Sequence, residues 1–289
     1  MSIFNILYYR YKPIAKKGMI LNMDIIVQKF GGSSVKDNTM LLKVCEHIRR
    51  EYNKGKGVVV VVSAQGKTTN NLIAQEKEIT NKPSPREHDV LISVGEQITI
   101  AKLCMVLHEQ GYKAISFTGW QVPIITDNIY TDANIIKVNK EKIINELEKG
   151  NIVVVAGFQG INEKMEITTL GRGGSDTTAT YLAGILNANI CEIYTDVNGV
   201  YDKDPNEYLD ANKYDIITYD DVLKITNGGA KVLHTKCVEV AKKMGVIIDV
   251  KLTSGNGEPG TLVKWKKFEK IVVNFEIYWY TYNIILRNT

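Results

Sequence analysis

Residues 25–30 read IIVQKF and residues 57–63 read GVVVVVS, two short apolar runs rich in β-branched side chains that flank a helix-like stretch at 37–54. The same alternation continues, with strand candidates at 113–117, 151–158, 191–195 and 245–252 and helix candidates at 86–110, 140–149, 176–187 and 234–244. This pattern indicates buried, mostly parallel strands whose right-handed crossovers place helices on both faces of one sheet. We therefore expect an α/β fold, with a loop at NKPSPRE (81–87).

The composition is that of a globular domain. The chain has 289 residues, of which 44% are hydrophobic and 24% charged, and this balance excludes disorder and collagen. Its 36 basic and 32 acidic residues leave a net charge of +4, which is too weak for a nucleic-acid surface. A small anionic ligand is compatible with this charge.

The cysteines and the N-terminal segment point to the cytoplasm. No two of the four cysteines form C-x-x-C, so neither a zinc knuckle nor a redox pair is encoded, and we expect buried thiols in a reducing compartment. No uninterrupted run of about 18 apolar residues exists, and Arg10, Lys12 and Lys16 break up the first segment, unlike a signal peptide. We expect no membrane partner, and an N-terminal extension at residues 1–22.

Ligands of open parallel sheets bind beyond the carboxyl ends of the strands, so the turns that follow strands are the first places to look for a site. After the first strand, Lys29 precedes Gly31 and Gly32. Paired glycines let backbone N–H groups approach a phosphate, and a lysine at the end of an apolar strand needs an anion or water. A Gly-Gly pair is also typical of an ordinary strand-to-helix turn.

The densest cluster is GRGGSDTTA at 171–179, where glycines flank Arg172 and a helix follows. Arginine can grip a carboxylate with two hydrogen bonds, and Ser175 and Asp176 add a hydroxyl and a carboxylate at a helix N-terminus. The alternative is that Asp176 only caps the helix and Arg172 is a solvated loop charge.

Two further turns carry polar residues. The sequence GKT at 66–68 does not make a P-loop, because the motif requires glycine at position 61, which is valine. Ser63 and Thr69 offer hydroxyls for a polar substrate, or Thr69 caps a helix.

The second of these turns, YTDVNGVYDKDPN at 194–206, is acidic and aromatic. Tyr201 could cover an adenine ring, and acidic residues could approach magnesium bound to phosphates, although the same residues are common in plain turns. No glutamate stands where an EF-hand needs one.

Two single residues complete the set. Glu96 lies in an otherwise apolar helical stretch, where an ionised carboxylate is costly without a cationic partner or a ligand ammonium. Lys231 in GGAKVLH is a second lysine for phosphate, or a solvated loop residue.

Together these motifs resemble the catalytic domain of aspartokinases, members of the amino-acid kinase superfamily. The resemblance runs from about residue 24 to GTLV at 260–263, and GRGGSDTTA distinguishes aspartokinases from the sister families. The motifs stand in the family's order: KFGGSSV (29–35), VSA (62–64), GE (95–96), GFQG (157–160), GRGGSDTTA (171–179), YTDVNGVYDKDP (194–205) and GAKVLH (229–234).

The resemblance implies a three-layer αβα sandwich with a mostly parallel central sheet. It implies transfer of the ATP γ-phosphoryl group to the side-chain carboxylate of L-aspartate, giving 4-phospho-L-aspartate, the first step toward lysine, threonine and methionine. ATP would be the cofactor, with Mg²⁺ held mainly through its phosphates and no dedicated protein metal site. The enzyme would be a cytoplasmic homodimer.

The resemblance also assigns residues by position. Lys29, Asp176 and Lys231 would be catalytic. The ATP-binding residues would be Lys29, Phe30, Gly31, Gly32, Thr195, Asp196, Tyr201, Asp204, Asn206 and Lys231. The aspartate-binding residues would be Ser63, Thr69, Glu96, Phe158, Arg172, Ser175 and Asp176.

The sequence departs from the family in three places. Asn206 stands where the family usually has arginine, Thr235 stands where it usually has proline, and residues 264–289 stand in place of two ACT regulatory domains. We therefore expect a catalytic domain at 23–263 and a separate tail. The alternatives are an inactive homologue that acts as a binding or assembly partner, and a sister kinase that phosphorylates glutamate.

Overall fold

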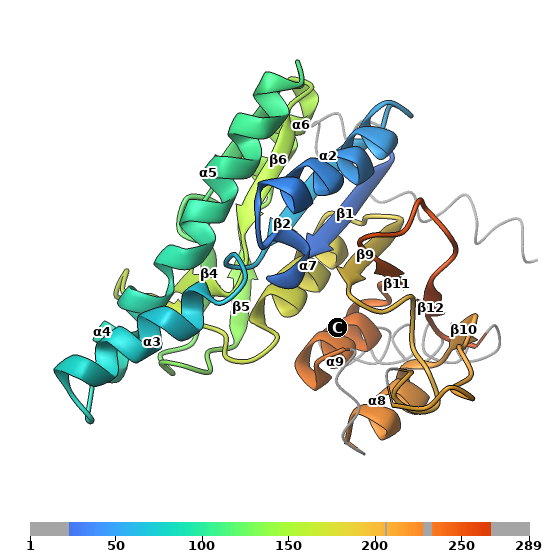
Figure 1. Ribbon diagram of the computed structural model, residues 1–289. Coiled ribbons are helices and arrows are strands. Elements are labelled where there is room, and N and C mark those ends of the chain that lie inside the picture. Colours follow the sequence, from blue (N-terminus) through green and yellow to red (C-terminus); the bar gives the residue numbers. More distant parts are fainter. Residues whose placement is uncertain (1–22, 206, 228–232, 267–289) are drawn as a thin grey trace, which may run out of the picture.

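The computed structural model describes residues 23–205, 207–227 and 233–266. Its main sheet has the strand order β10-β12-β11-β9-β1-β2-β6-β3, and of its seven strand pairs β11–β12 alone is antiparallel (Figure 1). The strands are β1 (Ile25–Phe30), β2 (Gly57–Val62), β3 (Ala114–Phe117), β6 (Ile152–Ala156), β9 (Ile190–Thr195), β10 (Ile216–Ile217), β11 (Ile248–Leu252) and β12 (Thr261–Val263).

The helices are η1 (Ser33–Val35), α2 (Asn38–Tyr52), α3 (Thr68–Ile79), α4 (Pro85–Ile92), α5 (Val94–Glu109), α6 (Glu141–Glu148), α7 (Gly174–Ile185), α8 (Tyr219–Asn227) and α9 (Thr235–Met244). A small second sheet, in the order β5-β4-β7-β8, contains β4 (Ile124–Thr126), β5 (Ile135–Val138), β7 (Gln159–Ile161) and β8 (Ile167–Thr169).

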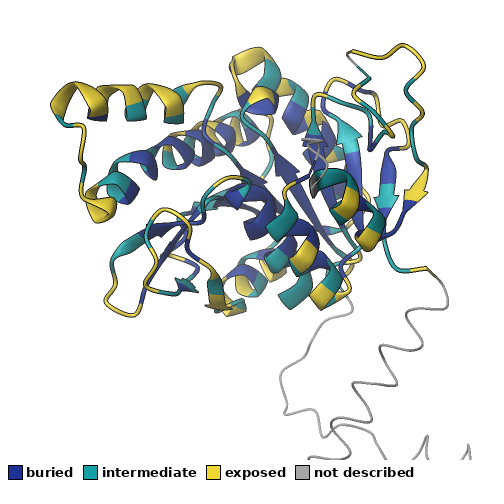
Figure 2. Ribbon diagram, turned by 90° about the horizontal axis from the view of Figure 1, so that it is seen from below, coloured by how far each residue is buried: buried dark blue, intermediate teal, exposed yellow. Residues whose placement is uncertain are grey.

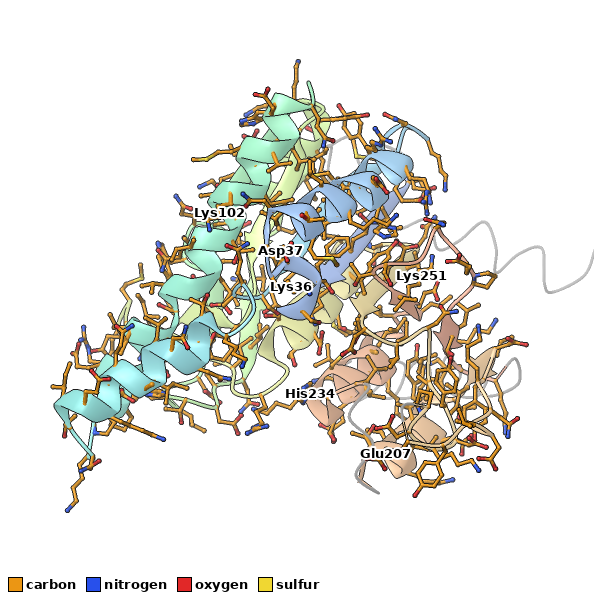
Figure 3. The ribbon with its side chains drawn as sticks, in the orientation of Figure 1. Lys36, Asp37, Lys102, Glu207, His234 and Lys251 are labelled. Carbon is orange, nitrogen blue, oxygen red and sulfur yellow. The ribbon has the colours of Figure 1, made fainter. Side chains whose placement is uncertain are left out.

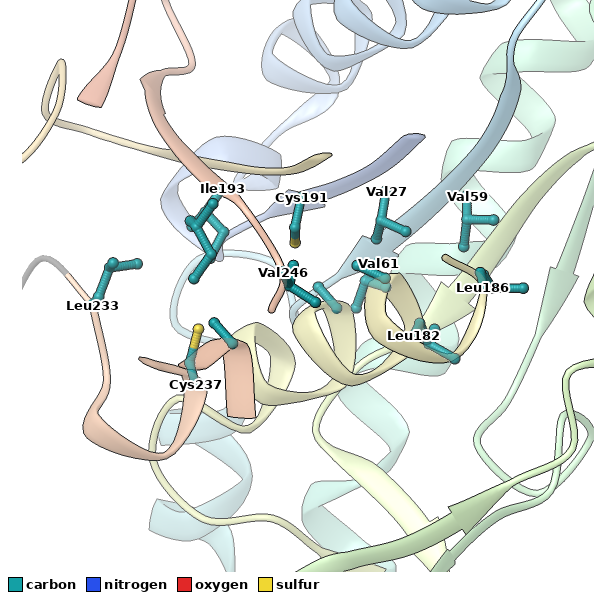
Figure 4. Packing of buried hydrophobic residues seen from close by; sticks show 14 of the residues in the cluster. Val27, Val59, Val61, Leu182, Leu186, Cys191, Ile193, Leu233, Cys237 and Val246 are labelled. Atoms are coloured by element: carbon teal, nitrogen blue, oxygen red, sulfur yellow. The ribbon is translucent and has the colours of Figure 1, made fainter. Parts of the chain in front are cut away.

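The central strands are buried on both faces, because successive side chains alternate between two apolar cores (Figure 2). Val27, Val59 and Val61 pack with residues of α6, α7, α8 and α9, and Figure 4 shows them facing Leu182 of α7 and Leu186, the C-cap of that helix. Val58 and Val60 pack on the opposite face with residues of α2 and α5. Helices on both faces of a mostly parallel sheet confirm the predicted αβα sandwich.

Helices α4 and α5 together span Pro85–Glu109, a segment that is long and apolar enough to cross a membrane by length and composition. Half of its most apolar window is buried within the protein, and α5 packs against β3, β6 and α2. The apolar part of this segment therefore belongs to the core of the fold, mainly through α5.

The six predicted strands and the helices at 37–54, 140–149, 176–187 and 234–244 are confirmed within a few residues. The helix predicted at 86–110 divides at Ser93, and Pro85, placed in the predicted loop, is the first residue of α4. The helix expected to begin near Thr69 is α3, and the structure adds α8, β10, β12 and the second sheet, which were not predicted. All four cysteines are buried and free, as expected.

Candidate active site

Most of the predicted site residues come from neighbouring parallel strands and from the start of α7. Strands β9, β1, β2 and β6 are adjacent, so their carboxyl ends meet at one edge of the sheet. The turns that follow β1, β2 and β6 carry the glycine pair, Ser63 and Phe158, and Thr195 is the last residue of β9. The candidate site is built on this edge.

A buried ion pair lies at its centre. Lys29 Nζ and Asp176 Oδ1 are 2.5 Å apart, and both residues are less than a tenth exposed. Oδ1 has no hydrogen-bond partner among the described residues, so the contact is a charge pair without hydrogen-bond alignment. A β-carbon added at Gly31 would lie 3.3 Å from Lys29 Nζ. The ammonium group therefore lies against the glycine turn.

The turns after β1 and β2 pack tightly on each other. Gly66 N–H donates to the Gly32 carbonyl at 3.0 Å, and a β-carbon on Gly32 would lie 2.9 Å from the Ala64 carbonyl oxygen. Only glycine fits at position 32, because any side chain would push the two turns apart.

Glu96 on α5 approaches the turn after β2 and is 3% exposed. Its Oε1 accepts a hydrogen bond from Ala64 N–H at 3.0 Å, while Oε2 has no partner among the described residues. Burial raises the pKa of Glu96 to about 8. No described cation forms an ion pair with this carboxyl group, so it stays mostly protonated near neutral pH until a ligand cation approaches it.

The turn at 171–174 leads directly into α7. Gly171 and Gly173 adopt left-handed conformations, with φ of +72° and +71°, and Gly173 is the N-cap of the helix. Asp176 thus lies inside the first helical turn, so the alternative that it merely caps α7 is wrong. Arg172 is exposed and forms no ion pair with any described residue, which leaves its guanidinium available to a ligand.

Ser175 and Phe158 lie beside this turn. A β-carbon on Gly157 would lie 2.6 Å from Ser175 Oγ, so the end of β6 almost touches the start of α7. Phe158 has a φ of +70°, and its N–H donates to Thr178 Oγ1 at 3.2 Å while its carbonyl accepts from Leu170 N–H. A strained non-glycine backbone held by two hydrogen bonds is typical of a functional site.

Ser63 and Thr69 are both half-buried near the end of β2. Thr69 is the second residue of α3, whose N-cap is Lys67, so the prediction that Thr69 caps this helix is wrong.

The predicted nucleotide residues lie on and after β9. Thr195 Oγ1 donates to Asp196 Oδ1 at 3.0 Å, and the Thr195 carbonyl accepts from Thr253 N–H. Tyr201 is half-buried and forms a single antiparallel bridge with Lys213, and the Asp204 carbonyl accepts two backbone hydrogen bonds in a turn. Asn206 and Lys231 lie outside the described residues.

The sequence predictions missed Asp89, a fully buried carboxylate on α4 that binds backbone groups near the Arg172 turn. Its place directly before the apolar stretch VLISV, seven positions before Glu96, was the signal that could have indicated it.

Within the described part of the chain, no three histidine, cysteine, aspartate or glutamate residues converge to hold a metal ion. A magnesium ion here would therefore take most of its ligands from phosphate oxygens and water. Lys29 and the glycine turn are suited to the phosphates themselves.

The sequence is similar to a known protein family and to curated proteins. Residues 24–253 match the model of the amino acid kinase family. Over 242 residues the chain is 51% identical to the aspartokinase of Geobacillus stearothermophilus, covering 84% of this chain and 59% of that protein. The chain thus spans about three fifths of the length of such curated relatives.

Two solved structures are similar over 84% of the chain. The aspartate kinase from Synechocystis is 42% identical with a TM-score of 0.76, and 40% of it is covered. The E. coli aspartokinase III in complex with aspartate and ADP is 27% identical with a TM-score of 0.75, and 65% of it is covered. The predicted resemblance to aspartokinases is confirmed.

Proposed function

This chain belongs to the amino acid kinase family, and from that premise we propose that it transfers the γ-phosphoryl group of ATP to the side-chain carboxylate of L-aspartate. The observation that carries the proposal is the charge arrangement around the Lys29–Asp176 pair. Neither exposed Arg172 nor buried Glu96 has an ion-pair partner among the described residues. Arg172 offers a cation for a substrate carboxylate, and Glu96 offers a carboxyl group that would ionise when a substrate ammonium approaches it. The names of the similar curated proteins support aspartate as the acceptor.

The acceptor needs little activation. A side-chain carboxylate is already ionised near neutral pH, so no general base is required. The protein has to align the two substrates and to neutralise charge on the transferred phosphoryl group.

Lys29 is the residue that we assign to the transferred phosphoryl group. Its ammonium lies against the glycine turn and is held by Asp176 before any nucleotide binds. A preorganised cation costs no reorganisation when charge moves in the transition state. The Gly31 and Gly32 backbone would face the phosphates, with Phe30 ending the strand below them and Lys231 as the second cation.

Aspartate would lie between Arg172 and Glu96. Arg172 would grip a substrate carboxylate with two hydrogen bonds, and Glu96 would pair with the ammonium group. Because the pKa of Glu96 is raised to about 8, pairing with an ammonium would release the proton that Glu96 otherwise carries at pH 7. Ser63, Thr69, Phe158 and Ser175 would complete the wall of the pocket.

The nucleotide would lie along the end of β9. Thr195, Asp196, Tyr201, Asp204 and Asn206 would surround its base and sugar, as the family resemblance implies. Mg²⁺ would bridge the phosphates and neutralise part of their charge when bound.

The product, 4-phospho-L-aspartate, would enter lysine, threonine and methionine synthesis in the cytoplasm. Four buried, unpaired thiols support a reducing compartment. We keep the homodimer as a prediction, to be checked by light scattering.

The test is acyl-hydroxamate formation by the purified full chain with MgATP, hydroxylamine and either L-aspartate or L-glutamate. We expect hydroxamate with aspartate and at most a trace with glutamate, and Lys29→Met should lower kcat by at least about a hundredfold. Lys137→Met, which removes an exposed lysine of the small sheet, is the matched control and should keep full activity. A product with glutamate alone, or none from a folded protein that binds ATP, would contradict the proposal.

A further inference from the structure

Asp89 on α4 is completely buried, and both of its carboxylate oxygens are used. Oδ2 accepts backbone N–H bonds from Thr131 and Thr169, each at 2.9 Å, and Oδ1 accepts the Thr169 hydroxyl at 2.7 Å. No described cation pairs with Asp89, so these three donors alone compensate the burial of its charge. Such a residue fixes the segments that supply the donors.

Those segments flank the turn that carries Arg172. Thr169 ends β8 and lies three residues before Arg172, and its carbonyl accepts Ala133 N–H at 2.9 Å. The segment that contains Thr131 continues into Asp132, and a β-carbon on Gly171 would collide with the Asp132 carboxylate. Asp89 therefore holds both the strand that enters the turn and the loop that packs on it.

The other side of the turn rests on α9. His234, the N-cap of α9, packs so closely on Gly173 that a β-carbon there would overlap its ring, and Figure 3 shows His234 at the start of this helix. Lys236 Nζ pairs with Asp132 Oδ1 at 2.5 Å. The Arg172 side chain has no ion-pair partner among the described residues, so the backbone of this turn sets the point from which the side chain extends.

We propose that Asp89 is a positioning residue for substrate binding: it anchors the turn 170–174 to α4 and so sets the place of Arg172. The inference rests on the proposed function, since Arg172 is assigned there to the substrate carboxylate. It predicts a dependence of aspartate binding on a residue that does not touch the substrate.

The pattern of hydrogen bonds predicts different results for two substitutions. Asp89→Ala removes all three acceptor contacts, and it should raise the KM for aspartate about tenfold or more while changing the KM for ATP less than about twofold. Asp89→Asn should stay near the parent, because its amide oxygen can accept both backbone N–H groups while its NH₂ donates to the Thr169 hydroxyl.

Neighbouring threonines provide the matched control. Thr169→Val removes one bond to Asp89 and should raise the KM for aspartate, whereas Thr168→Val should not. Thr168 is equally buried on the same strand, but its hydroxyl pairs with Thr126 at 2.6 Å.

The double variant that combines Asp89→Ala with Arg172→Ala distinguishes an effect of Asp89 through Arg172 from a general disturbance of the fold. If Asp89 acts through Arg172, the double variant should have about the same KM for aspartate as Arg172→Ala alone. The proposal would be overturned if the two substitutions multiplied their separate effects on the KM for aspartate, or if Asp89→Ala raised the KM for ATP to the same extent.

Hydrogen exchange of backbone amides tests the positioning role without relying on catalytic activity. Asp89→Ala should speed exchange of the amides at 131–134 and 169–174 and leave β1 and β9 unchanged. Unchanged exchange in the turn would overturn the positioning role. Faster exchange in a protein whose parent form neither binds nor phosphorylates aspartate would instead contradict the proposed function.

Discussion

Replacing Glu96 by glutamine should stabilise the protein, by an amount that grows with pH. The carboxyl group is 3% exposed, accepts a single hydrogen bond from Ala64 and has no ion pair among the described residues. Burial raises its pKa from 4.5 to about 8. Between these values the folded protein holds a proton that the unfolded chain has released, so the free energy of unfolding falls as pH rises.

The size of the effect follows from the two pKa values. Each unit of pKa corresponds to about 1.4 kcal/mol, so ionised Glu96 costs on the order of 5 kcal/mol above pH 8. Urea unfolding of the parent and of Glu96→Gln at several pH values should show the stability difference growing by about 3 to 4 kcal/mol between about pH 5 and pH 8. Asp249, whose pKa is also raised by burial, affects both proteins equally and cancels.

Glu109→Gln is the matched control, since Glu109 is exposed at the end of the same helix, and its profile should run parallel to that of the parent. A Glu96→Gln profile parallel to the parent would refute the reasoning. Calorimetry adds a second readout: at pH 7 aspartate binding should release a proton from the parent and none from Glu96→Gln.

Three further predictions concern the site. Arg172→Ala should mainly raise the KM for aspartate and Lys231→Ala should mainly lower kcat; the reverse pattern in steady-state kinetics would contradict both assignments. Gly157→Ala places a β-carbon 2.6 Å from Ser175 Oγ and should lower kcat/KM for aspartate at least about tenfold. Gly184→Ala is the control and should keep activity, because its β-carbon would meet only the flexible Met244 side chain. An equal loss of kcat/KM in the two variants would contradict the packing argument. Chelating Mg²⁺ should abolish turnover without unfolding the protein, and metal that stays bound to the ATP-free protein through gel filtration would contradict a phosphate-held ion.

The sequence predicted the central layers because strands buried on both faces read as continuous apolar runs, as GVVVV in β2 does. The second sheet could not be predicted in this way, since its strands have only three or four residues. The sequence indicated only a helix start near Thr69 and not the extent of α3, because Glu76 is the only buried residue of α3 and the helix lacks an apolar face to recognise.

The turns at the strand ends were predictable because glycine and charge patterns are local. Lys29 was predicted to need an anion, and the structure gives it Asp176, which is 147 positions away in the sequence. Asp89 could not be predicted as an anchor, because its partners Thr131 and Thr169 lie 42 and 80 residues away and two of its three contacts are backbone groups. Because nearly every residue has a backbone N–H, the sequence does not show which of these groups will bind a buried carboxylate.

The central claim is phosphorylation of the side-chain carboxylate, and borohydride reduction of the reaction product tests it directly. Borohydride converts an acyl phosphate to an alcohol, so 4-phospho-L-aspartate would yield homoserine, whereas phosphorylation of the α-carboxylate would yield 3-amino-4-hydroxybutanoate. After incubation of the full chain with MgATP and L-aspartate, we predict homoserine as the reduced product. The isomeric amino alcohol, or unreacted aspartate alone, would contradict the account.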